Sequence, residues 1–147
     1  MGIIERKFRL QVPSTTENLA MIREFAAHVG SQAGLDDGAI SKLELAVDEA
    51  CTNVIEHAYG SDVSKEVTVR AVFDEEVLQV IVEDTGLGFD PTAVPAEDLR
   101  TLVAERRTGG LGMQLMKSLM DEVHYEITPG QRNELRMIKR LRKPSAS

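Results

Sequence analysis

Residues 49–53 read Glu49-Ala50-Cys51-Thr52-Asn53 and lie inside a long helical pattern. Helical residues four apart are offset by only about 40° around the axis, so Glu49 and Asn53 project side by side. The amide oxygen of Asn53 is a hard ligand that suits magnesium already bound to phosphates and water. The carboxylate of Glu49 can accept a proton from a hydroxyl group that attacks a phosphate. On spacing alone, a solvated polar helix face is the simpler explanation.

A second run, Asp84-Thr85-Gly86-Leu87-Gly88, ends a nearly all-apolar strand pattern. Asp84 has the parity of the apolar residues two, four and six positions earlier, which predicts a carboxylate on the apolar side of the strand. A buried carboxylate needs hydrogen-bond donors, and the exocyclic amine of adenine is a suitable one. Gly86 and Gly88 would let the backbone pass close to a flat base. A hairpin end built from turn-forming residues explains the run about equally well.

A third run, Thr108-Gly109-Gly110-Leu111-Gly112, comes just before a further helical pattern. Free backbone N–H groups and the positive end of the helix dipole attract anions at such a place. Arg107 and Thr108 could reach phosphate oxygens, although surface charge and a flexible loop give the same pattern. Taken together, the three runs predict the parts of one site for ATP and magnesium.

The remaining pattern predicts the order strand, helix, helix, two strands, long loop, helix, two strands. Alternation over residues 7–12 indicates a strand near a sheet edge, and residues 67–83 form the surest hairpin. Ser14 and Glu17 have capping-box spacing for a first helix that should end at Gly30.

The second helix should begin near Asp36 or Asp37 and continue to Gly60, with His57 in the same row as Glu49 and Asn53. A third helix is expected around residues 113–120, followed by strands at 123–127 and 134–141. Between the hairpin and the third helix, residues 89–108 contain prolines and little periodicity. A loop that long is usually functional or mobile, so we expect a lid over the nucleotide.

Composition indicates an ordinary globular protein of 147 residues, most simply a single domain over 1–147 with its core at about 8–142. The formal charge of −7 gives no basic footprint for direct nucleic-acid binding. No apolar leader or stretch of 18 apolar residues occurs, so we expect no membrane association and a cytoplasmic location. The single cysteine, Cys51, is expected to be a reduced structural thiol.

The order of the three runs resembles the GHKL (histidine-kinase-like) ATPase superfamily. Within it, residues 48–59 look very like the helix of the anti-sigma-factor serine/threonine kinases. This resemblance covers about residues 8–142 and implies an α/β (α+β) two-layer sandwich of the Bergerat type. Its sheet would be mixed and largely antiparallel, with helices on one face and the nucleotide between the helices and a loop lid.

The resemblance also implies a role for each matching residue. Glu49 would be the general base, Asn53 the magnesium ligand and Asp84 the adenine acceptor. Gly86 and Gly88 would form the turn beside the base. The phosphates would contact Arg107, Thr108 and the glycine-rich run that follows them. The members of that run are Gly109, Gly110, Leu111 and Gly112.

The resemblance further implies a kinase that phosphorylates a serine on an anti-anti-sigma partner of the STAS fold, sequesters a sigma factor, and works as a homodimer. A histidine kinase would add a phosphoacceptor hairpin upstream, and too few residues precede the first expected helix for one. One alternative is a nucleotide-responsive binding module of the same fold without useful kinase activity. Another is an ordinary α/β domain that binds no nucleotide, which would need all three runs to be coincidences.

Overall fold

The computed structural model describes residues 5–55, 65–84, 110–128 and 132–141. The elements follow the predicted order. They are β1 (Arg6–Pro13), a 3-10 turn (Thr16–Asn18), α1 (Leu19–Gln32), α2 (Asp37–Asn53), β2 (Glu66–Phe73), β3 (Val77–Asp84), α4 (Gly110–Leu119), β4 (Glu122–Thr128) and β5 (Arg132–Arg140). The expected lid, residues 89–108, and the expected end of the second helix at Gly60 both lie outside the described residues.

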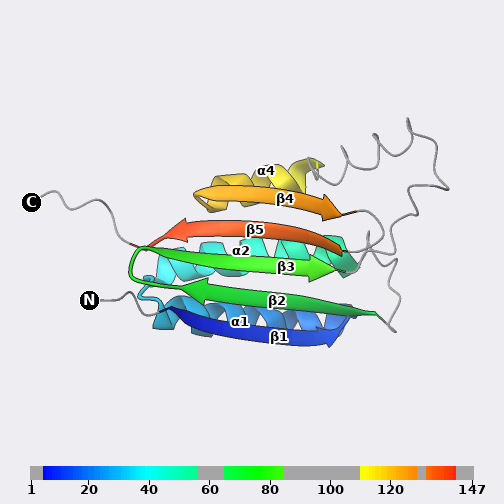
Figure 1. The fold of residues 1–147 in the computed structure, drawn as a ribbon, viewed down its shortest axis with the longest axis horizontal. Helices are drawn as coiled ribbons and strands as arrows, with labels where there is room; N and C mark the ends of the chain where they lie inside the picture. Colours follow the sequence, from blue (N-terminus) through cyan, green and yellow to red (C-terminus); the bar gives the residue numbers. More distant parts are fainter. Residues whose placement is uncertain (1–4, 56–64, 85–109, 129–131, 142–147) are drawn as a thin grey trace, which may run out of the picture.

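The five strands form one sheet in the order β1-β2-β3-β5-β4, and all four pairings are antiparallel. The largely antiparallel sheet is therefore confirmed, and no parallel pair occurs among these strands to make it mixed. β1 is an edge strand, as its alternating pattern predicted. Helices α1, α2 and α4 all lie on one face of the sheet, so the two-layer sandwich is confirmed (Figure 1).

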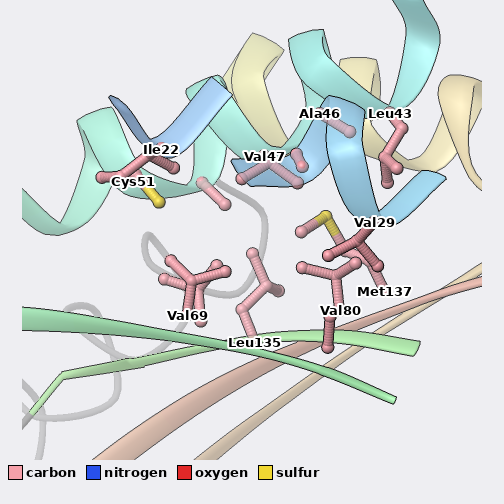
Figure 2. Close-up of a cluster of buried hydrophobic side chains, with 14 of the residues drawn as sticks. Ile22, Val29, Leu43, Ala46, Val47, Cys51, Val69, Val80, Leu135 and Met137 are labelled. Carbon is pink, nitrogen blue, oxygen red and sulfur yellow. The ribbon is translucent and has the colours of Figure 1, made fainter. Parts of the chain in front are cut away.

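The face of the sheet beneath the helices, the covered face, carries every second residue of each strand. In β3 these are Leu78, Val80 and Val82, each no more than 1% exposed. Figure 2 shows strand side chains such as Val80 and Met137 pointing toward the helices that carry Ile22 and Val47. This burial of apolar area is the main force that holds the helices on the sheet.

The opposite face of the sheet, the open face, carries the other residues of each strand, and no helix within the described ranges covers it (Figure 1). Its residues align in rows across the strands. One row contains Thr68, Glu83, Glu134 and Glu126, and the next contains Arg70, Ile81, Arg136 and His124. The open face is therefore mainly polar, with acidic and basic rows side by side.

The first helix differs from its prediction at both ends. Ser14 is buried and its hydroxyl has no hydrogen-bond partner, and a 3-10 turn without a side-chain cap precedes α1, so the capping box is wrong. The helix also continues past Gly30 to Gln32, and Gly34 follows with φ of +92°. Gly30 lies inside α1 where space is tight, because a Cβ there would lie 3.1 Å from the Leu43 side chain.

The start of α2 is as predicted. The side chain of Asp36 accepts a hydrogen bond from the Ala39 N–H at 2.8 Å, which satisfies one free donor of the first turn. None of the helices within the described ranges is long and apolar enough to span a membrane.

Candidate active site

The described residues of the three predicted runs belong to elements that end or begin at one end of the sandwich. Figure 1 shows the last turn of α2, the end of β3, the beginning of α4 and the beginning of β5 at the same end of the sheet. Adjacent antiparallel strands explain part of this arrangement, because β3 ends where β5 begins. A ligand bound there would contact two helix ends and a strand end together.

Asp84 is the last residue of β3 and is 3% exposed. It continues the covered-face series of Leu78, Val80 and Val82, so the prediction of a carboxylate on the apolar side is confirmed. The Nδ2 group of Asn133 donates a hydrogen bond to Asp84 Oδ1 at 2.9 Å. This bond supports the carboxylate within an otherwise apolar layer.

Asn133 is a residue that the sequence reasoning missed. It is 5% exposed and lies directly opposite Asp84 in the β3–β5 register. The predicted strand began one residue later, at Glu134, which left Asn133 outside it. The available signal was strand parity. Asn133 lies two residues before Leu135 and four before Met137, so all three belong to the same buried series.

Glu49 and Asn53 are half-buried in the second half of α2, one turn apart as predicted. Their neighbour Asp48 points to α1, where its Oδ1 accepts from Arg23 Nη1 at 2.7 Å. Glu49 and Asn53 lie about 100° and 140° further around the helix axis than Asp48. Because α2 lies between α1 and α4 (Figure 1), both residues are on the flank of α2 turned away from α1 and toward the α4 side.

The glycine-rich run lies partly inside a helix rather than before it. Gly110 is the first residue of α4, and Leu111 and Gly112 belong to its first turn. The expectation that the whole run precedes the helix is therefore wrong for these three residues. The free N–H groups of this turn still belong to a helix N-terminus at the site end of the sheet, where anions bind favourably.

Several predicted positions lie outside the described part of the chain. They are His57, Gly86, Gly88, Arg107, Thr108 and Gly109. Within the described residues, no group of three or more His, Cys, Asp or Glu side chains could hold a metal ion by itself.

Cys51 lies between Glu49 and Asn53 in sequence but points into the core (Figure 2), where it is fully buried. Burial, and secondarily the negative charge of Asp48, raises the pKa of the Cys51 thiol far above its ordinary value. The thiol therefore stays protonated at neutral pH and is a poor nucleophile.

The sequence matches the histidine kinase-like ATPase domain family over residues 12–139. The chain belongs to this ATPase family. It is 38% identical to the serine-protein kinase RsbW of Bacillus subtilis over 122 residues, which cover 80% of this chain and 76% of that protein. It is 35% identical to RsbW of Listeria monocytogenes, with 84% and 81% covered.

A solved structure agrees with this family assignment at the level of the fold. The RsbU and RsbW domains of a Mycobacterium tuberculosis protein superpose with a TM-score of 0.67 at 17% identity, over 95% of this chain and 34% of that chain. The histidine kinase-like ATPase fold expected from the three runs is thus confirmed, and the named relatives place the chain among the RsbW serine-protein kinases.

Proposed function

We propose that this protein is an ATP-dependent serine-protein kinase and anti-sigma factor. Its substrate would be a serine of an anti-anti-sigma partner of the STAS fold, and it would sequester a sigma factor when that partner is absent. The observation that carries this proposal is the buried Asp84 at the strand end, held by Asn133 beside the ends of α2 and α4. The family of the chain supports the same activity.

Asp84 and Asn53 fit ATP and magnesium. A buried carboxylate needs donors, and the amine of adenine supplies one to Asp84. Asn53 lies at the end of α2 with a neutral oxygen for magnesium. The first turn of α4 offers backbone N–H groups to the phosphates, with Gly110, Leu111 and Gly112 as its residues. We propose Gly86, Gly88, Arg107, Thr108 and Gly109 as further contacts on sequence grounds alone.

In the proposed reaction, bound magnesium supplies positive charge that offsets the charge on the phosphates. Glu49 accepts the proton of the serine hydroxyl as the serine oxygen bonds to the terminal phosphorus of ATP. The bond between that phosphorus and the bridging oxygen breaks, and ADP leaves. Glu49 and Asn53 share one helix flank, so the base and the metal ligand keep a fixed spacing. That fixed spacing favours transfer because positioning dominates catalysis of phosphoryl transfer.

The finer features stay proposals. We infer that the protein acts in the cytoplasm as a homodimer and exchanges one protein partner for the other. Because relatives are named as serine-protein kinases, the alternative of a binding module without kinase activity has no specific observation in its favour.

The test is transfer of labelled phosphate from ATP to a STAS-type partner by the purified full-length protein, with and without magnesium. We expect label on a single serine of the partner, and no label when that serine is replaced by alanine. ATP binding is measured on the same preparation. A protein that binds both ATP and the partner but transfers nothing would leave the binding-module alternative in place.

A further inference from the structure

The rung next to Asp84 and Asn133 carries two like charges, which lie on the open face. Glu83 is opposite Glu134 in the β3–β5 register, one rung before Asp84 and Asn133. The two glutamate side chains are only 18% and 11% exposed. Like charges directly opposite each other on antiparallel strands destabilise the pairing, and partial burial weakens the screening by water.

Arginines from two strands offset this repulsion. Arg70 of β2 donates from Nε to Glu83 Oε1 at 2.7 Å, and its Nη2 lies 3.6 Å from Glu134 Oε1. Arg132 and Arg136 lie 3.4 and 3.7 Å from oxygens of Glu134. Within the described ranges, Arg70 is the one cation that contacts both carboxylates.

Packing holds Arg70 over these carboxylates. Ile81 of β3 is 4% exposed although it lies on the open face, where no described helix covers it. Arg70 and Arg136 flank it in the register on either side. Arginine stems can cover an apolar side chain while their charged ends reach carboxylates, and the charged ends of Arg70 and Arg136 do reach Glu134.

We propose that Arg70 is a positioning residue for nucleotide binding that acts through the sheet from the open face. Successive residues of a strand point to opposite faces, so the backbone that carries Glu83 and Glu134 continues directly into Asp84 and Asn133. Without Arg70, repulsion between the glutamates spreads the strand ends and disturbs the hydrogen bond from Asn133 to Asp84. This inference rests on the proposed function, in which Asp84 receives adenine.

The experiment is calorimetric titration of Arg70→Met with ATP and magnesium. We expect affinity about 2- to 30-fold weaker than in the unmodified protein, the range for residues that act on a site without touching the ligand. Arg9→Met is the matched control. Arg9 lies opposite Arg70 on the same face, donates to Gln11, and forms no ion pair with any described residue. It should bind ATP normally.

A charge rescue separates positioning from general damage. Glu83→Gln in the Arg70→Met background removes the repulsion, so affinity should return to within about twofold of the unmodified protein. The triphosphate of purine riboside lacks the exocyclic amine. Its affinity for the unmodified protein and its affinity for Arg70→Met should differ much less than the two affinities for ATP. If Arg70→Met fails to fold, Arg70→Lys keeps the charge without the fork and should show a smaller loss.

Unchanged ATP affinity in a folded Arg70→Met protein would overturn the inference, as would a loss that Glu83→Gln does not rescue. An equal loss in Arg9→Met would mean that the charge of the open face acts only at long range. These outcomes differ from failure of the proposed function. That failure would appear as normal ATP affinity in Asp84→Ala.

Discussion

The two faces of the β3–β5 ladder are made from alternate residues of the same strands, yet their buried side chains are stabilised in different ways. On the covered face, Leu78, Val80 and Val82 pack beneath the helices, and the last rung joins Asp84 to Asn133 through a hydrogen bond. On the open face, Glu134 pairs with Arg70 of another strand and with Arg132 and Arg136 of its own strand. A carboxylate buried beneath helices needs specific hydrogen-bond donors. A carboxylate among arginines already has ion-pair partners, so it needs no ligand to account for it. This contrast is why we propose Asp84, rather than Glu83 or Glu134, as the carboxylate that binds adenine.

The largest effect is expected at the flank of α2. Glu49→Gln should slow phosphoryl transfer to the partner by about 10²- to 10⁴-fold, because the general base is lost, and should leave ATP affinity nearly unchanged. Labelled-phosphate transfer and calorimetry on the same preparation measure the two quantities. Glu44→Gln, a half-buried carboxylate earlier in α2, is the control and should transfer phosphate normally. Normal transfer by Glu49→Gln would remove it as the base.

The two faces can be compared directly in stability. Leu78→Ala removes a fully buried side chain from the covered face and should lower the free energy of unfolding by about 2–5 kcal/mol. Gln79→Ala changes the next residue, on the open face, and should stay within about 0.5 kcal/mol. Urea denaturation of both variants provides the measurement. Similar losses in the two would contradict the assignment of the faces.

Asp84→Ala tests the polar rung of the covered face. Removal of a hydrogen bond that involves a charged group costs roughly 1.5–3 kcal/mol, so ATP affinity should fall about 10- to 150-fold. The control is Glu126→Ala, which removes an exposed carboxylate from the open face. Calorimetric titration should show no change there. Equal affinities in the two variants would eliminate Asp84 as the adenine acceptor.

The smallest effect is expected at the turn that joins β2 to β3, outside both faces. Hydrogen bonds from the N–H groups of Val77 and Glu76 lower the pKa of Asp74 below its ordinary value. A carboxyl whose pKa is lowered on folding stabilises the protein above its unfolded pKa, and this contribution is lost as pH falls through the folded pKa.

The stability gap between the unmodified protein and Asp74→Asn should therefore be present at neutral pH and shrink in acid. Thermal unfolding of both proteins between neutral and acid pH measures it. A gap that is independent of pH would assign the effect to side-chain geometry rather than charge.

Local rules predicted much of this arrangement. The alternation of β3 correctly placed Asp84 on the apolar side, and the helical period correctly placed Glu49 and Asn53 on one flank of α2. Local rules failed where packing decided the outcome. Ser14 and Glu17 had capping-box spacing, but the Ser14 hydroxyl is buried without a hydrogen-bond partner. Gly30 was expected to end the first helix, but it lies inside α1, close to the side chain of Leu43.

The sequence by itself determined the order of elements, the face on which the residues of β3 lie, and the family of the chain, because these depend on periods of 2 and 3.6 and on short motifs. Only the tertiary structure decided that Asn133 supports Asp84 and that Arg70 bridges Glu83 and Glu134. Asn133 lies 49 residues after Asp84. Such contacts depend on the strand order and on the register between distant strands, which no local pattern encodes.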